Sequence, residues 1–219
     1  MLEYKKEFID FVIKSNVLRF GDFTLKSGRQ SPYFFNSGLF NTGKQLSQLG
    51  KFYAEALVQS DIDYDVIFGP AYKGIPLVSS LSIALSNNHN IDIPYSFNRK
   101  EAKDHGEGGI LVGSKLTGNV LIVDDVISAG TSVRESYNII KDNLATPSAV
   151  LIALDRQEKG EGEKTTINEI TEDLGLKVRS IISLSDMIEY LEIIIKSDPT
   201  KMIILDKIKE YQHQYGDMS

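Results

Sequence analysis

Two neighbouring aspartates, Asp124 and Asp125, follow an apolar run of valine, leucine and isoleucine at residues 120–123. Such a run is typical of a buried strand, so both carboxylates are expected at its carboxyl end. A loop that contains small residues follows at 126–130, and a helical pattern begins at Thr131. The backbone N–H groups of such a loop and of the helix N-terminus form a site suited to a phosphate.

The acidic pair beside this site indicates which other groups are bound. Two carboxylates would repel a bare phosphate, whereas they suit sugar hydroxyls or a hydrated Mg²⁺. Ser128, Thr131 and Ser132 add hydroxyl donors to the loop. The alternative is a capped helix that follows two solvated aspartates, but the combination of strand, acids and loop favours a binding site.

A second polar segment covers residues 99–109, RKEAKDHGEGG. It carries Arg99, Lys100, Lys103 and His105 close together, with three glycines after them. A solvated hairpin tip is the usual role of such a charge run. Beside a phosphate site, the same segment is suited to act as a mobile lid that stabilises an anionic leaving group and excludes water.

The elements that position these residues alternate along the chain. Strands are expected at 65–69, 91–97, 118–124, 149–154 and 177–183, and helices at 2–13, 43–59, 74–85 and 131–143, between the last two strands and twice near the C-terminus. Residues 17–40 contain turn formers and short strands. This order predicts an α/β fold with a parallel sheet covered by helices on both faces, in which ligands bind at the carboxyl ends of the strands.

Composition narrows the functional classes. The 219 residues, 42% hydrophobic and 25% charged, predict a single globular domain over 1–219. The absence of cysteine excludes disulfide scaffolds, thiolate metal sites and cysteine nucleophiles. A net charge of −6 argues against a nucleic-acid binder. Without a long apolar run or the layout of a signal peptide, we expect a cytoplasmic protein with no membrane contact.

The segment 120–132 resembles the phosphoribosyl-pyrophosphate (PRPP) signature of the type I phosphoribosyltransferases. The resemblance implies that the paired acids contact the ribose hydroxyls and that the loop holds the 5-phosphate. The segment 99–109 closely resembles the flexible catalytic loop of one branch of that family, the orotate phosphoribosyltransferases, which would extend over about 99–112. At position 128 the sequence has serine where many members have threonine, and the hydroxyl is retained.

Two further segments resemble the parts of this branch that hold the donor and the base. Residues 23–35 resemble its substrate-binding stretch, in which Lys26 would contact PRPP and Phe34 and Phe35 would line the base pocket. Core packing is the alternative for this aromatic pair. The segment GPAYKG at 69–74 resembles the pyrophosphate loop and would supply two ligands, which are Tyr72 and Lys73.

A third segment, LDRQE at residues 154–158, resembles the strand end whose arginine meets the orotate carboxylate. The planar fork of Arg156 suits a carboxylate better than a lysine would. A surface ion pair is the alternative role for an arginine in this position.

The resemblance implies specific roles for the residues that match. The expected catalytic residues are Lys103, His105, Asp124 and Asp125. The expected PRPP contacts are Lys26, Tyr72, Lys73, Arg99, Lys100, Lys103, His105, Asp124, Asp125, Val126, Ile127, Ser128, Ala129, Gly130, Thr131 and Ser132. The expected orotate contacts are Phe34, Phe35, Ser128 and Arg156.

The family also implies an architecture and a reaction. It implies a five-stranded parallel core, a small hood built mainly from about residues 1–40, and a homodimer with shared active sites. Orotate and PRPP would give orotidine 5′-monophosphate and pyrophosphate in pyrimidine biosynthesis. Mg²⁺ would be held mainly by the donor and water, with support from Asp124 and Asp125.

Two alternatives remain at this point. A purine phosphoribosyltransferase shares the strand, acids and loop, but it would not need Lys26, Phe34, Phe35 and Arg156 together. A regulator that binds PRPP as an effector would need a nucleic-acid-binding surface, which an acidic chain without a basic module lacks.

Overall fold

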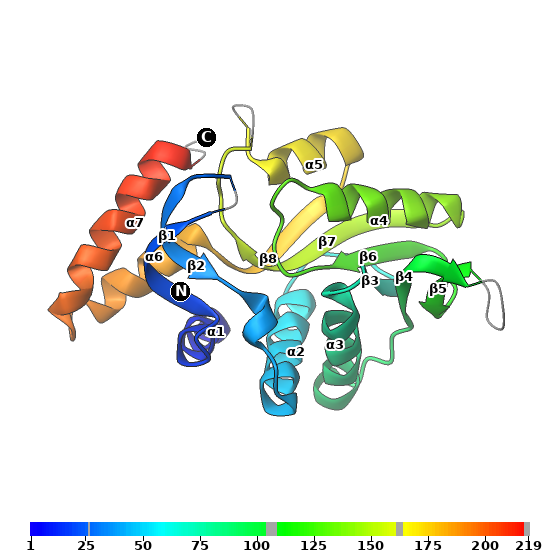
Figure 1. Ribbon diagram of the computed structural model, residues 1–219. Coiled ribbons are helices and arrows are strands. Elements are labelled where there is room, and N and C mark those ends of the chain that lie inside the picture. The colour runs from blue at the N-terminus through cyan, green and yellow to red at the C-terminus, as the bar shows by residue number, and fades with distance from the viewer. Residues whose placement is uncertain (26, 104–108, 161–163, 217–219) are drawn as a thin grey trace.

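The computed structural model describes residues 1–25, 27–103, 109–160 and 164–216. Its main sheet has six strands in the order β5-β4-β3-β6-β7-β8 (Figure 1). Their bounds are β3 Val66–Gly69, β4 Tyr95–Lys103, β5 Gly109–Gly113, β6 Asn119–Val123, β7 Thr146–Asp155 and β8 Lys177–Ser183. All neighbouring pairs are parallel except β4 and β5, which are antiparallel. The predicted five-stranded parallel core is therefore present, with one antiparallel strand added at its edge.

Helices cover both faces of this sheet (Figure 1). One face packs against α1 (Glu3–Lys14), α2 (Gly43–Val58) and α3 (Gly74–His89), and the other against α4 (Thr131–Asp142) and α5 (Thr166–Leu174). Side chains of β6 alternate between the two cores, with Leu121 in the first and Ile122 in the second. A strand with both faces buried needs apolar residues at every position, which explains why this run is continuous.

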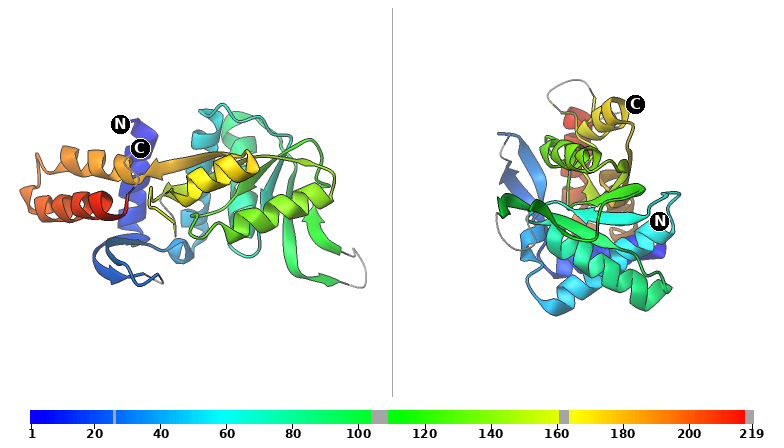
Figure 2. Two further views of the ribbon diagram at one scale, coloured as in Figure 1. Left: turned by 90° about the horizontal axis from the view of Figure 1, so that it is seen from above. Right: turned by 90° about the vertical axis from the view of Figure 1, so that its right-hand side faces the viewer.

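A two-stranded antiparallel sheet, here called the hood, lies apart from the main sheet, within the residues predicted to form such a hood. It consists of β1 (Leu18–Thr24) and β2 (Gln30–Phe35), and a short 3₁₀ helix, η1 (Ser37–Leu39), leads from it to α2. The C-terminal elements α6 (Leu184–Ile194), η2 (Pro199–Lys201) and α7 (Met202–Tyr215) lie at the same end of the molecule, and α7 packs against β2 (Figure 2).

The segment predicted as a loop over about 99–112 has strand residues at both of its ends. Residues 99–103 belong to β4 and residues 109–112 to β5, so strand pairing extends into the charged segment, whose residues 104–108 lie outside the described residues. The predicted strand at 91–97 begins only at Tyr95. Charged residues concealed the end of β4 because this strand lies near the sheet edge, where solvent reaches its side chains. Among the described residues, no helix is long and apolar enough to cross a membrane.

Candidate active site

A cavity of about 380 Å³ opens at the carboxyl ends of β3 and β6. These strands are neighbours, but the chain leaves β3 toward β4 and leaves β6 toward β7, on the opposite side. Such a divergence opens a crevice at the edge of a parallel sheet, where ligands of α/β proteins bind. The lining residues come from the loops after both strands and from the first turn of α4: Pro70, Ala71, Tyr72, Lys73, Asp124, Asp125, Val126, Ile127, Ser128, Ala129, Gly130, Thr131, Ser132 and Val133.

The structure thus brings together the predicted acids, the predicted phosphate loop and the predicted pyrophosphate loop. The phosphate loop ends at Gly130, whose φ of 74° lies in the left-handed region that favours glycine. A Cβ there would also come within 3.2 Å of Thr166 and Ile170 on α5. The turn directs the chain into α4, and the N-terminus of this helix lines the cavity.

Asp124 is a buried acid whose position is held from three directions. Its carboxylate accepts hydrogen bonds from Ser132 Oγ at 2.9 Å and from the N–H of Asp125 at 2.9 Å. The hydroxyl of Tyr53, on α2, donates to the backbone oxygen of Asp124 at 2.8 Å. Burial, and then the charge of Asp125, raise the pKa of Asp124 to about 6, although the hydrogen bonds from the Asp125 N–H and from Ser132 oppose the shift.

Asp125 is equally buried, and its carboxylate meets two residues from other segments. Oδ2 accepts a hydrogen bond from Lys73 Nζ at 2.7 Å and another from the hydroxyl of Ser37 in η1. Lys73 was predicted from the sequence as a ligand in this site, whereas Ser37 and Tyr53 were not. A lone serine or tyrosine carries no local signal of such a role, because its partner is distant in the sequence.

The pyrophosphate loop is anchored by a residue that sequence reasoning also missed. The N–H of Ala71 donates to Asn98 Oδ1 at 2.8 Å, and Asn98 is a buried residue of the neighbouring strand β4. A polar residue near the carboxyl end of a predicted parallel strand was the signal that could have identified it. Tyr72 is 71% exposed, so its ring is open to solvent at the cavity.

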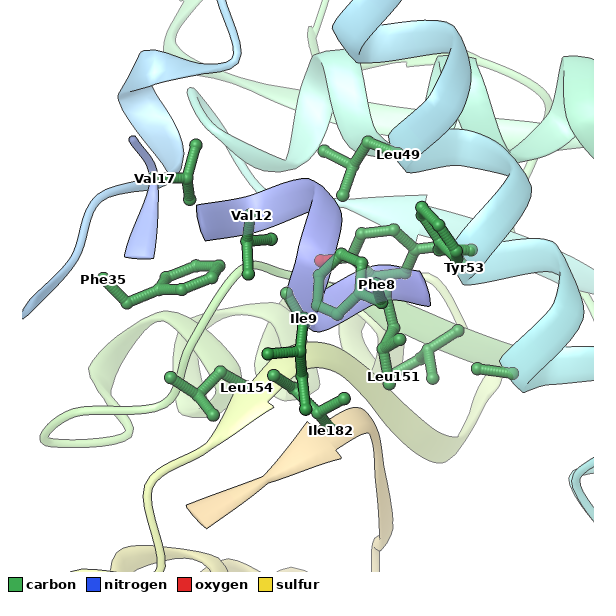
Figure 3. Close-up of a cluster of buried hydrophobic side chains, with 14 of the residues drawn as sticks. Phe8, Ile9, Val12, Val17, Phe35, Leu49, Tyr53, Leu151, Leu154 and Ile182 are labelled. Carbon is green, nitrogen blue, oxygen red and sulfur yellow. The ribbon is translucent and has the colours of Figure 1, made fainter. Parts of the chain in front are cut away.

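The predicted orotate contacts other than Ser128 are not among the residues that line this cavity. The side chain of Phe35 is 8% exposed and belongs to the core, near Val12, Val17 and Leu154 (Figure 3). This side chain therefore packs in the core, and its role in the base pocket stays a prediction. Phe34 is half-buried, and its ring centroid lies 5.6 Å from that of Phe23.

Arg156 lies just beyond the end of β7 with 14% of its side chain exposed. Oε1 of Glu158 accepts a hydrogen bond from Arg156 Nε at 2.8 Å and lies 2.5 Å from Arg156 Nη2. Arg156 therefore forms an ion pair, which is the alternative role predicted for this arginine.

The predicted basic residues are only partly within the described chain. Lys26, His105 and the side chain of Lys103 lie outside the described residues. On β4, the Nη1 atom of Arg99 donates to the oxygen of Gly109 at 3.3 Å, and Lys100 Nζ lies 3.7 Å from Oε2 of Glu135 on α4.

Comparison with known proteins decides the family. A phosphoribosyl transferase domain model matches residues 40–179. An orotate phosphoribosyltransferase of Vibrio cholerae is 56% identical over 216 residues, which cover 99% of this chain and 100% of that protein. One of Shewanella oneidensis is 58% identical and covers 99% of each chain. The chain belongs to the orotate phosphoribosyltransferases.

The same family is found by comparison of structures. The crystal structure of an orotate phosphoribosyltransferase from Francisella tularensis matches with a TM-score of 0.85 and 45% sequence identity. The match covers 96% of this chain and 99% of the Francisella chain. The predicted resemblance to orotate phosphoribosyltransferases and the predicted type I fold are both confirmed. The cavity between β3 and β6 is therefore the candidate active site of a member of this family.

Proposed function

We propose that this cavity transfers the 5-phosphoribosyl group from PRPP to orotate, which yields orotidine 5′-monophosphate and pyrophosphate for pyrimidine biosynthesis. The observation that carries the proposal is the placement of Asp124 and Asp125 at the carboxyl end of β6, beside the N-terminus of α4 and opposite Lys73. A phosphorylated sugar requires both an anion site and acceptors for its hydroxyls, and this cavity offers both.

The donor would extend across the cavity from the loop before α4 to the loop after β3. The 5-phosphate would bind the N–H groups of residues 126–132, and the ribose hydroxyls would donate to the two carboxylates. The pyrophosphate would meet Tyr72 and Lys73, with Lys26 adding a further donor contact. Arg99 would also contact PRPP. Lys100, Lys103 and His105 would approach from the neighbouring subunit of a homodimer, so that each active site is shared.

Mg²⁺ fits the residues present as a cofactor bound largely by substrate. No cluster of three or more potential metal-binding side chains exists in the described part of the chain. Two buried, adjacent carboxylates, one with a raised pKa, nevertheless favour a nearby cation. Asp124 and Asp125 would support an ion held mainly by donor oxygens and water, and that ion would neutralise charge on the leaving pyrophosphate.

The remaining residues position the reactants. Displacement at the anomeric carbon through an oxocarbenium-like state requires no protein nucleophile. This agrees with a sequence that has no cysteine and with two carboxylates that would contact the sugar. Ser128 at the loop, Phe34 and Phe35 at the hood and Arg156 beyond β7 would orient orotate, with Arg156 on its carboxylate. Catalysis then rests on orientation of the two substrates and on neutralisation of the departing charge.

A spectrophotometric assay tests the proposal. Orotate absorbance should fall only when PRPP is added, and Mg²⁺ should be required. Adenine, hypoxanthine and uracil serve as control bases. Conversion of a purine in place of orotate would overturn the assignment of the substrate.

A further inference from the structure

A compact polar cluster surrounds the side chain of Glu158, which is 14% exposed. Its Oε1 accepts hydrogen bonds from Arg156 and from the hydroxyls of Tyr211 at 2.8 Å and Tyr33 at 3.3 Å. Arg29 Nη1 lies 3.7 Å from its other oxygen, Oε2. One carboxylate thus contacts two guanidinium groups and two phenols.

These residues come from three separate parts of the fold. Tyr33 belongs to β2, Tyr211 to α7, and Arg156 and Glu158 to the segment after β7. Arg29, just before β2, also donates to the backbone oxygens of the two residues after Glu158, at 2.9 and 3.1 Å. The hydrogen bonds of this cluster therefore connect the hood and α7 to the segment after β7.

The hydrogen bonds fix the orientation of the Arg156 guanidinium. Glu158 occupies the edge formed by Nε and Nη2, and the ring of Tyr33 lies under the guanidinium, 4.6 Å from ring centroid to Cζ. Within the described residues, no protein group accepts a hydrogen bond from Nη1. Nη2 also donates to the hydroxyl of Tyr211 at 3.5 Å. Nη1 therefore remains open to an oxygen of a second carboxylate, which arginine favours as a partner.

The charge of the cluster also suits an anion. Two guanidinium groups around one carboxylate leave a net charge of one positive unit in a partly buried place. Burial, and then the charge of Glu158, raise the pKa of Tyr211 to about 12, and burial raises the pKa of Tyr33 well above its usual value. Both phenols thus remain protonated and act as hydrogen-bond donors to Glu158.

We propose that Glu158 is a positioning residue for orotate recognition, which holds the Nε and Nη2 atoms of Arg156 so that Nη1 meets the orotate carboxylate. The inference rests on the proposed function, in which Arg156 binds that carboxylate. Tyr33 and Tyr211 complete the arrangement because their hydroxyls hold Glu158 in place. Orotate affinity then depends on α7, an element outside the cavity between β3 and β6.

The test compares Glu158→Gln with Glu210→Gln, a control that removes an exposed carboxylate one residue before Tyr211 on α7. Glu158→Gln should raise the orotate KM about tenfold, while the PRPP KM and the melting temperature change little. Glu210→Gln should change none of these quantities. Tyr211→Phe, which removes a single hydroxyl, should raise the orotate KM about threefold and gives a milder variant if Glu158→Gln does not fold.

A double-mutant cycle separates positioning from a structural role. If Glu158 acts through Arg156, the combined Arg156→Lys and Glu158→Gln changes should raise the orotate KM by less than the product of the single effects. Independent, multiplicative effects would overturn the proposal. So would an orotate KM in Glu158→Gln that stays within about twofold of wild type or falls, or a rise in both KM values together with a lower melting temperature.

The cycle also distinguishes this inference from the proposed function. If Arg156→Lys raises the orotate KM and Glu158→Gln does not, only the role of Glu158 is wrong. If Arg156→Lys leaves orotate use unchanged, the assignment of Arg156 to orotate fails and the role of Glu158 fails with it.

Discussion

Lys73 and Asp125 form an ion pair across the candidate active site, with Nζ 2.7 Å from Oδ2. The lysine side chain is 61% exposed and the aspartate side chain is 7% exposed, so a solvated cation pairs with a buried anion. In the proposed function, PRPP replaces both halves of this pair. Its pyrophosphate takes Lys73, while its ribose hydroxyls donate to Asp125.

Lys73→Gln should therefore weaken use of the donor rather than of orotate. Loss of a charge-assisted hydrogen bond costs about 1.5–3 kcal/mol, so the PRPP KM should rise at least about tenfold. Steady-state kinetics with both substrates varied provides the measurement. A change confined to the orotate KM would remove Lys73 from the donor site.

Asp124→Asn should stabilise the protein most at high pH. The pKa of Asp124 is raised to about 6 by burial and then by Asp125, so the native state binds this proton more tightly than the unfolded chain does. The resulting stability is present in full below the ordinary aspartate pKa and is lost as pH rises through about 6.

The gain in unfolding free energy of Asp124→Asn over wild type should thus be about 1 kcal/mol larger at pH 8 than at pH 5. Urea denaturation at the two pH values measures the difference. The same gain at both pH values would show that Asp124 titrates normally in the native state.

Arg156→Lys should impair orotate recognition although the positive charge is kept. A lysine ammonium cannot serve Glu158 along one edge and a substrate carboxylate along another, as a planar guanidinium can. Titration of orotate, with and without bound donor, should show at least about tenfold weaker binding. Affinity that remains close to that of the wild type would leave Arg156 as a structural ion pair with Glu158.

Mixed dimers test whether the active site is shared between subunits. Lys103→Ala and Asp125→Asn should each be poorly active alone, and the two proteins are then dissociated and reassociated together. In a mixed dimer, one site receives both defects and the other receives neither. Activity should approach about half of wild type per mixed dimer if the sites act independently. Verified mixed dimers as inactive as both parents would contradict sharing.

Local sequence patterns predicted the parts of the site that are continuous in the chain. The apolar strand, Asp124, Asp125 and the loop up to Ser132 lie within thirteen consecutive residues, and the fold keeps them together. The alternation of strands with helices likewise predicted the parallel sheet, because strand and helix periodicities are local.

Contacts between distant residues could not be predicted in this way. Tyr53 lies 71 positions before Asp124, and Ser37 lies 88 positions before Asp125, so only the packing of α2 and η1 against the sheet brings them together. Tyr33 meets Glu158 across 125 positions for the same reason. The strand β5 was not predicted, because it forms by pairing with β4, a contact that its own sequence does not show.

Calorimetric titration of PRPP with Mg²⁺ measures directly whether the acids at the end of β6 bind the donor. Wild type is compared with Asp125→Asn and with Asp206→Asn, which removes an exposed aspartate on α7. Asp125→Asn should bind PRPP at least about tenfold more weakly, because the buried charge-assisted contact to the ribose hydroxyls is lost. Asp206→Asn should bind as wild type does. PRPP affinity in Asp125→Asn equal to that of both other proteins would contradict the assignment of this cavity as the donor site.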